Sequence, residues 1–175
     1  FIDIASIGEG EKIFSQILEN YPSKEWHNVN SIIYRKNNNL FTTNPILRIE
    51  DLNEIPSPFL NGYFDKIIKS NPQEQWIALL ETNRGCPFSC TFCDWGIGAK
   101  KRMKEFDLER IMKEIDWISE HKIPFVYCCD ANFGMYKERD LMITLKMSKN
   151  KDKTGYPERF SVQNTKNYTE SSYDI

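Results

Sequence analysis

The chain has 175 residues, and its 40% hydrophobic and 13% aromatic content is enough for a packed core, which argues against global disorder. This length suits one ordinary domain or parts of two. The formal net charge of −2 gives no general reason to expect a nucleic-acid or membrane partner. Because no apolar run approaches the length of a membrane span and no secretion signal is recognisable, we expect a cytoplasmic protein.

The first expected elements are a strand, a tight turn and a helix. Residues 1–7 are typical of a short buried strand, and Gly8-Glu9-Gly10-Glu11 of a tight turn. Apolar residues between Lys12 and Leu18 recur on one helical face. This order is half of a βαβ unit, and the free N–H groups at the helix start could hold an anionic or polar ligand edge. A tight turn with no ligand explains the glycines equally well.

A hairpin and a linker are expected next. Residues 29–42 predict two short strands joined by a polar turn at 36–39. Residues 44–58 contain three prolines and predict an extended linker. Residues 59–70 predict a short helix that precedes the next domain.

From residue 75 onward, strands and helices alternate, so the fold class is α/β. Strands are expected at 76–80, 125–129 and 160–163, with the first buried on both faces. Helices are expected from an Asp107 cap to residue 122 and at 138–148. The alternation implies a parallel sheet with right-handed crossovers, either open or curling into a barrel.

The number of residues sets how much of a barrel this chain can form. A complete eight-stranded barrel needs about 250 residues, so we expect only its first half. The chain also opens at Phe1 without an initiator Met and stops at Ile175 with no obvious terminal element. A processed mature chain has such ends, but we favour a fragment of a longer protein. Its open sheet edge predicts poor stability or aggregation in isolation.

Three of the five cysteines lie together at Cys86, Cys90 and Cys93. An odd, clustered set argues against a secreted disulfide framework and favours metal or redox chemistry in a reducing cytosol. A structural zinc site normally has four ligands in paired spacing. No second Cys-x-x-Cys pair is formed by the candidates for a fourth ligand, which are Cys128, Cys129, His27 and His121.

An iron–sulfur cluster is the competing interpretation of the same three cysteines. Iron–sulfur loops commonly use short cysteine spacings, and three thiolates leave one iron open to an exogenous ligand. The loop directly follows the expected strand at 76–80. Ligands of α/β sheets bind at the carboxyl ends of the strands, which is where this loop is expected.

The motif Cys-x3-Cys-x-aromatic-Cys, with Phe92 as the aromatic residue, resembles the signature of radical S-adenosylmethionine (SAM) enzymes. The resemblance covers residues 75–167. It implies that Cys86, Cys90 and Cys93 bind three irons of a 4Fe–4S cluster, whose fourth iron takes the amino and carboxylate groups of SAM. One electron from the cluster would then cleave the sulfonium and give a 5′-deoxyadenosyl radical, while the protein positions the reactants and excludes water and oxygen.

The resemblance also implies which residues meet SAM. Phe92 would pack near the adenine, although a plain core phenylalanine fits as well. Asp130 and Asn132 stand where the family commonly has Gly-Gly-Glu and would meet the methionyl amine, although an Asx turn explains them too. Cys128 and Cys129 are expected to be buried small hydrophobes. The other positions assigned to SAM are Trp95, Gly96, Ser161 and Gln163.

The amino-terminal part resembles cobalamin-binding radical SAM proteins through Gly8-Glu9-Gly10-Glu11, the hairpin and the segment 52–59. In these proteins GEGE closes the last βα unit of a Rossmann-like domain, which implies that Gly8, Glu9 and Gly10 contact cobalamin. Residues 1–22 would then end a cobalamin-binding domain, 23–74 would form a hairpin and linker, and 75–175 the first half of a barrel. Some members with this layout have lost cobalamin.

The implied reaction is cobalamin-dependent methyl transfer to an unactivated carbon. A cobalamin-independent rearrangement or methylthiolation, and a non-catalytic iron–sulfur or zinc module, remain alternatives. The substrate, a small molecule or a peptide, cannot be named from the residues. The implied partner is an electron donor such as flavodoxin or ferredoxin. The basic run Lys100-Lys101-Arg102 could meet such a donor or an anionic substrate, although a solvated surface explains it too.

Overall fold

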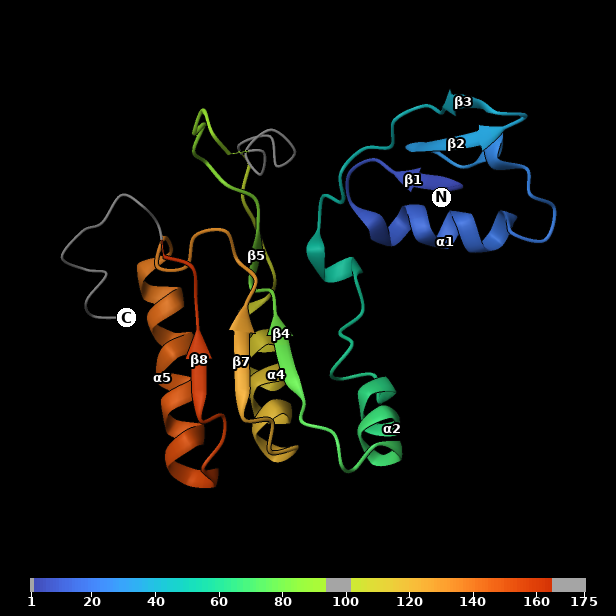
Figure 1. Ribbon diagram of the computed structural model, residues 1–175. Coiled ribbons are helices and arrows are strands. Elements are labelled where there is room, and N and C mark those ends of the chain that lie inside the picture. The colour runs from blue at the N-terminus through green and yellow to red at the C-terminus, as the bar shows by residue number, and fades with distance from the viewer. Residues whose placement is uncertain (1, 94–101, 165–175) are drawn as a thin grey trace. The chain divides into compact units, whose positions relative to one another are not determined.

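The computed structural model describes residues 2–93 and 102–164. The chain divides into two compact units, Phe1–Glu50 and Asp51–Ile175 (Figure 1). The expected domain limits fell after residues 22 and 74, whereas the division between the units falls after the hairpin. The reason is that the hairpin pairs with the first strand instead of standing in a linker.

The first unit is an antiparallel sheet with one long helix beside it. The sheet order is β1-β2-β3. The β2–β3 turn has Asn37 and Asn38 at φ of 51° and 63°, the left-handed conformation that suits a two-residue hairpin. The expected hairpin is therefore confirmed. The elements are β1 (Ile4–Ser6), α1 (Gly10–Asn20), the 3-10 turn η1 (Trp26–Asn28), β2 (Ile32–Lys36) and β3 (Asn39–Thr42).

The small core of this unit is built from α1 and β2. Ile13, Val29, Ile32 and Tyr34 are buried together. Phe14 is 60% exposed, so only part of the expected apolar face of α1 packs inside the unit. The expectation that the first strand is buried was wrong: β1 is mostly exposed, because it is a short edge strand paired only with β2.

The second unit holds a parallel sheet of order β4-β7-β8. The strands follow one another in sequence, and α4 and α5 connect them, as the alternating pattern predicts. A separate two-stranded antiparallel ladder, β5–β6, stands after β4. The elements are η2 (Leu52–Glu54), α2 (Tyr63–Ser70), β4 (Ile77–Leu80), β5 (Asn83–Arg84), β6 (Lys104–Glu105), α4 (Leu108–Glu120), β7 (Phe125–Cys128), α5 (Lys137–Thr154) and β8 (Arg159–Ser161).

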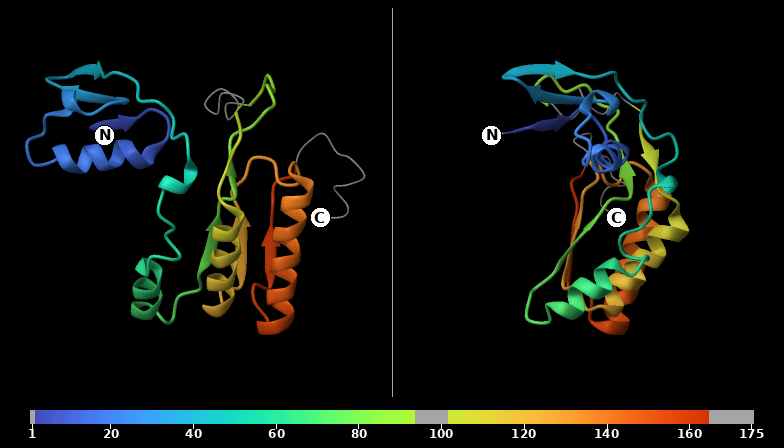
Figure 2. Two further views of the ribbon diagram at one scale, coloured as in Figure 1. Left: turned by 180° about the vertical axis from the view of Figure 1, so that it is seen from behind. Right: turned by 90° about the vertical axis from the view of Figure 1, so that its right-hand side faces the viewer.

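Within the described residues, helices cover one face of the parallel sheet. The right-hand view of Figure 2 shows α4 and α5 together on one side of the strands. Ala78 and Leu80 of β4 point to that side and are buried, whereas Ile77 and Leu79 are 56% and 64% exposed. The expectation that β4 is buried on both faces was therefore wrong. An apolar run of strand length does not reveal whether both faces have partners.

α4 and α5 begin within one residue of their expected starts, whereas α2 begins at Tyr63 and not at residue 59 as expected. The Asp107 carboxylate accepts hydrogen bonds from the backbone N–H groups of Glu109 (2.7 Å) and Arg110 (3.3 Å), so the expected cap of α4 is confirmed. α5 runs six residues beyond its expected end and stops at Gly155, whose φ of +84° provides a left-handed C-cap. Within residues 2–93 and 102–164, no helix has the length and apolar character of a membrane span.

Candidate metal centre

The three cysteines lie on the segment that follows β4 and β5, at the carboxyl end of β4. All three are half-buried and free of disulfides. The N–H of Cys93 donates to the carbonyl oxygen of Cys90 at 3.1 Å, which holds these two residues in a tight turn. The β5–β6 ladder pairs Arg84 with Lys104 and so closes the base of the loop. Trp95 and Gly96 lie outside the described residues.

Gly85 fixes the backbone just before Cys86. Its φ is +125°, and a Cβ at this position would lie 2.6 Å from the carbonyl oxygen of Arg102. A side chain is therefore excluded for two reasons, which are the backbone conformation and the close approach of the Arg102 backbone. Sequence reasoning passed over this glycine, although its place directly before the cysteine motif was a signal.

Asp130, expected to meet SAM, is enclosed by protein groups. Its side chain is almost fully buried. Oδ1 accepts from the backbone N–H groups of Thr82 (2.7 Å) and Asn83 (3.1 Å). Oδ2 accepts from the Thr82 hydroxyl and, at 2.7 Å, from Nδ2 of Asn83. These contacts join the end of β7 to the segment that leads to the cysteines; we call them the Asp130 clamp.

Burial raises the pKa of Asp130, because a carboxylate loses hydration inside the protein, while the hydrogen bonds from Thr82 and Asn83 act in the opposite direction. Nothing places SAM beside Asp130, so its expected contact with the methionyl amine stays a prediction. The clamp is a role that the sequence did not suggest.

Arg139, at the start of α5, supports the clamp and was missed by sequence reasoning. Its Nη1 donates to the Thr82 hydroxyl at 3.0 Å, and its Nη2 donates to the backbone oxygens of Thr82 (2.7 Å) and Phe106 (3.1 Å). Nε lies 3.2 Å from Oε2 of Glu105 on β6. One guanidinium thus ties α5 to both strands that flank the cysteine loop. Arginine is suited to this because its donors form a planar fork.

Asp140, the next residue, holds the turn between β7 and α5. It is fully buried, and its Oδ2 accepts from the N–H groups of Gly134 (2.8 Å) and Tyr136 (3.1 Å). Burial raises the pKa of Asp140, against the effect of these two hydrogen bonds and of Arg139. Asn132 and Phe133 directly precede the residues that Asp140 holds.

Asn132 brings the segment after β7 into contact with the cysteine loop. Its Nδ2 donates to Sγ of Cys86 at 3.1 Å, and the residue is only 6% exposed. The next residue, Phe133, is buried, and its N–H donates to the carbonyl oxygen of Gln163 at 2.8 Å. The structure therefore places Cys86, Asn132 and the segment after β8 on one rim of the sheet.

Two of the remaining SAM candidates, Ser161 and Gln163, lie on or near the open face of the sheet. The strand register sets Leu79, Tyr127 and Ser161 side by side. Nε2 of Gln163 donates to the Tyr127 hydroxyl at 2.6 Å. Phe92 is 74% exposed, so a plain core phenylalanine does not describe it.

The two other cysteines differ from each other. Cys128 is fully buried, and burial, followed by the nearby Asp130, raises the pKa of its thiol far above the usual range. The expected buried hydrophobe is confirmed for Cys128. Cys129 is half-buried, and burial and Glu81 raise the pKa of its thiol. Both thiols therefore stay protonated at neutral pH in the absence of a metal.

The candidate fourth ligand His121 is engaged elsewhere. Its Nε2 lies 2.9 Å from Oδ1 of Asp65, and its Nδ1 lies 2.8 Å from the backbone oxygen of Trp117. Within the part of the chain that the structure describes, no three His, Cys, Asp or Glu side chains stand close enough to hold one metal ion. A cluster does not require this, because each thiolate binds a different iron. The three soft, half-buried thiols fit an iron–sulfur cluster by donor type.

The glycine turn in the first unit also has a structural role. Gly8 has φ of +100°, and α1 begins at Gly10. The Glu9 carboxylate accepts from Nη2 of Arg48 (3.1 Å) and from the N–H of Ile49 (2.7 Å). Glu9 thus anchors the segment after the hairpin. The expected contact of Gly8, Glu9 and Gly10 with cobalamin stays a prediction.

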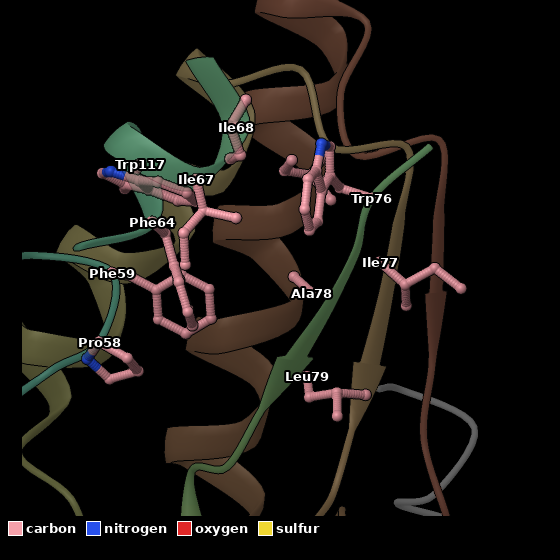
Figure 3. A pocket seen from close by; sticks show the side chains of 11 residues that line it. Pro58, Phe59, Phe64, Ile67, Ile68, Trp76, Ile77, Ala78, Leu79 and Trp117 are labelled. Carbon is pink, nitrogen blue, oxygen red and sulfur yellow. The ribbon is translucent and has the colours of Figure 1, made fainter. Parts of the chain in front are cut away.

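A separate apolar cavity of about 260 Å³ lies beside the first half of β4. Figure 3 shows Phe59, Phe64 and Trp117 on one side of this cavity and Ala78 and Leu79 of β4 on the other. Its lining contains no cysteine, histidine or carboxylate. The cavity therefore offers no metal ligands, and it lies toward the end of β4 opposite the cysteine loop.

Over its whole length the chain is homologous to a segment of the cobalamin-dependent radical SAM methyltransferases. It is 34% identical to 2-(S-pantetheinyl)-carbapenam-3-carboxylate methyltransferase of Streptantibioticus cattleyicolor and 32% identical to the cobalamin-dependent radical SAM methyltransferase TokK of Streptomyces tokunonensis. All of this chain aligns with 26% of each relative, so it spans about a quarter of their length. No protein-family profile matches the chain.

Solved structures resemble the fold as well. The cobalamin-dependent SAM radical enzyme OxsB, with aqua-cobalamin and SAM bound, has a TM-score of 0.57 and 25% identity, over 83% of this chain and 21% of that one. The radical SAM methyltransferase TsrM of Kitasatospora setae has a TM-score of 0.58 over 90% of this chain and 31% of that one. At 13% identity, the likeness to TsrM concerns the fold alone.

Proposed function

We propose that this chain is the segment of a cobalamin-dependent radical SAM methyltransferase that carries the iron–sulfur cluster. The observation that carries the proposal is the Cys86-x3-Cys90-x2-Cys93 loop at the carboxyl end of the first parallel strand. The homology of the whole chain to methyltransferases of this class supports it. The activity is methyl transfer to an unactivated carbon, with cobalamin as the methyl carrier.

In this proposal Cys86, Cys90 and Cys93 hold the cluster, and SAM takes the iron that lacks a protein ligand. When bound, the cluster and SAM would supply the radical chemistry that removes a hydrogen atom from the substrate. The described residues contribute geometry: the Asp130 clamp and Arg139 fix the strand ends from which the cysteine loop projects. Neither group needs to transfer a proton for the radical step.

We further propose that the open face of the β4-β7-β8 sheet lines the interior of a partial barrel. Its exposed apolar side chains, Ile77 and Leu79, are typical of a face that other elements cover. Tyr127, Ser161 and Gln163 lie at the end of this face nearest to Asn132 and Cys86, which supports their proposed contact with SAM. The first unit would close a cobalamin-binding domain.

The electron donor in this proposal is a flavodoxin or ferredoxin, since each turnover begins with one electron. Arg102 is exposed and suits an acidic partner. Lys100 and Lys101, the rest of the expected basic run, lie outside the described residues. The substrate in this proposal is a small molecule or a peptide.

Anaerobic reconstitution of the intact protein tests this function. We expect about four irons per chain, and release of both 5′-deoxyadenosine and S-adenosylhomocysteine from SAM, since methyl transfer through cobalamin consumes SAM in two ways. Ala variants of Cys86, Cys90 or Cys93 should lose iron and deoxyadenosine, whereas the control Cys129→Ala should keep both. One tightly bound zinc with no SAM cleavage would refute the proposal. Deoxyadenosine without S-adenosylhomocysteine would refute methyl transfer alone.

A further inference from the structure

We propose that Asn132 is a positioning residue that donates a hydrogen bond to the Cys86 sulfur and so raises the reduction potential of the cluster. The proposal rests on the proposed function, because it needs a cluster on Cys86. The observation behind it is the 3.1 Å contact from Nδ2 of Asn132 to Sγ of Cys86. The sequence suggested a different role for Asn132, toward SAM.

The chemistry of the two groups decides which atom of the amide faces the sulfur. A ligating thiolate only accepts, and the amide offers two donors on Nδ2 and an acceptor on Oδ1. Oδ1 beside the thiolate would be repelled, so Nδ2 faces it. Asn132 is only 6% exposed, so little water competes for its amide, while Cys86 is half-buried. The hydrogen bond is charge-assisted once Cys86 is deprotonated.

Both ends of this contact are anchored by the Asp130 clamp. Asp130 precedes Asn132 by two residues, and its partners Thr82 and Asn83 precede Cys86 by four and three residues. A single buried carboxylate therefore fixes both segments at short range from the donor and the acceptor. The distance between Nδ2 and Sγ is set by this buried junction and not by a flexible loop.

Further contacts hold each partner from its other side. After Asn132, the backbone of Phe133 donates to Gln163 at 2.8 Å and that of Gly134 donates to Asp140 at 2.8 Å. Before Cys86, Gly85 packs against the backbone of Arg102. A side chain held on both sides loses little additional freedom when it donates, so the hydrogen bond persists.

The consequence for the cluster is electrostatic. Reduction adds one electron, much of whose charge spreads to the sulfur ligands. A donor aimed at one sulfur stabilises the reduced cluster more than the oxidised one, and hydrogen bonds to the sulfurs are a known determinant of cluster potential. Asn132 therefore makes the cluster easier to reduce by a weak physiological donor.

The test is a redox titration of the reconstituted intact protein, wild type and Asn132→Leu, followed by electron paramagnetic resonance. Leucine has nearly the same size as asparagine and no donor. At the wild-type midpoint we expect the ratio of reduced to oxidised cluster to fall about tenfold in the variant, a shift of about 59 mV to more negative potential for one electron. Asn71→Leu, at the end of α2, is the control and should keep the wild-type midpoint.

A second variant keeps the test decisive if Asn132→Leu fails to take up iron. Asn132→Asp keeps the shape and sets a carboxylate against the sulfur, so its midpoint should also be more negative than that of wild type. An unchanged midpoint in an Asn132 variant that holds a full complement of iron would overturn the inference. A wild-type protein that assembles no cluster would instead overturn the proposed function, so the two failures are distinguishable.

Discussion

Replacing Asp130 by alanine should destabilise the protein strongly, because four buried donors lose their acceptor at once. The donors are the two backbone N–H groups, the hydroxyl of Thr82 and the amide of Asn83. Thr82 and Asn83 are themselves buried, so water does not easily take the place of the carboxylate.

The expected loss in the free energy of unfolding follows from the cost of leaving each donor without an acceptor. A buried donor left without an acceptor costs about 1–3 kcal/mol. Part of this is offset, because alanine removes the penalty of burying a carboxylate, the same penalty that raises the pKa of Asp130. With four donors affected and this offset, we expect Asp130→Ala to lower the free energy of unfolding by about 3–5 kcal/mol.

The conservative variant Asp130→Asn should lose about 1–3 kcal/mol in free energy of unfolding. This loss is smaller because the oxygen that accepts from the two backbone N–H groups remains. Its new amide would face two donors, the Thr82 hydroxyl and Nδ2 of Asn83. Urea unfolding of the intact protein, followed by circular dichroism, measures both values. Asp152→Ala, an exposed change on α5, is the control and should stay within about 0.5 kcal/mol. An Asp130→Ala midpoint equal to that of the control would refute the reasoning.

Three further predictions concern the neighbours of the clamp. Gly85→Ala should at least halve the iron taken up in an iron assay, because the new Cβ would lie 2.6 Å from the backbone oxygen of Arg102. The control Gly155→Ala, whose Cβ would have no atom within 4 Å, should take up as much iron as wild type. Equal iron uptake by the two variants would contradict this prediction. Arg139→Met should lower Tm by several degrees in a thermal melt, since it unties α5 from β6, and an unchanged Tm would count against that link. Burial raises the pKa of Asp140 in the folded protein above its unfolded value near 3.8. The stability that Asp140 contributes is therefore fully present below pH 3.8 and is lost as the pH rises through the folded pKa. The unfolding free energy of wild type minus that of Asp140→Asn should therefore fall from pH 4 to 7, and a flat difference would refute it.

The elements that the sequence predicted well are those with local causes. The cap at Asp107 and the hairpin turn at Asn37-Asn38 depend on residues a few positions apart, so they can be read from the chain directly. The parallel order of β4, β7 and β8 follows from alternating strands and helices. The exposed face of β4 could not be predicted, because an apolar run gives the same pattern whether one face or both are covered.

The candidate ligands of the site could be proposed from the sequence, whereas the residues that support them could not. The spacing of Cys86, Cys90 and Cys93 identifies the motif locally. In the Asp130 clamp, Asp130 contacts Thr82 and Asn83, which precede it by 48 and 47 positions. Arg139 contacts Thr82 across 57 positions. Such contacts depend on the sheet register and on the start of α5, neither of which a single sequence specifies to the residue. Asn132 was correctly placed near the rim, but its partner was not foreseen.

The most direct test of the central claim is the electron paramagnetic resonance spectrum of the reduced, reconstituted protein before and after SAM is added. The claim is that Cys86, Cys90 and Cys93 hold a 4Fe–4S cluster with one iron left for SAM. We predict that SAM shifts the g values of the reduced cluster, because its amino and carboxylate groups change the ligands of that iron. A cluster signal that SAM leaves unchanged, or iron content that survives the loss of all three cysteines, would contradict the claim.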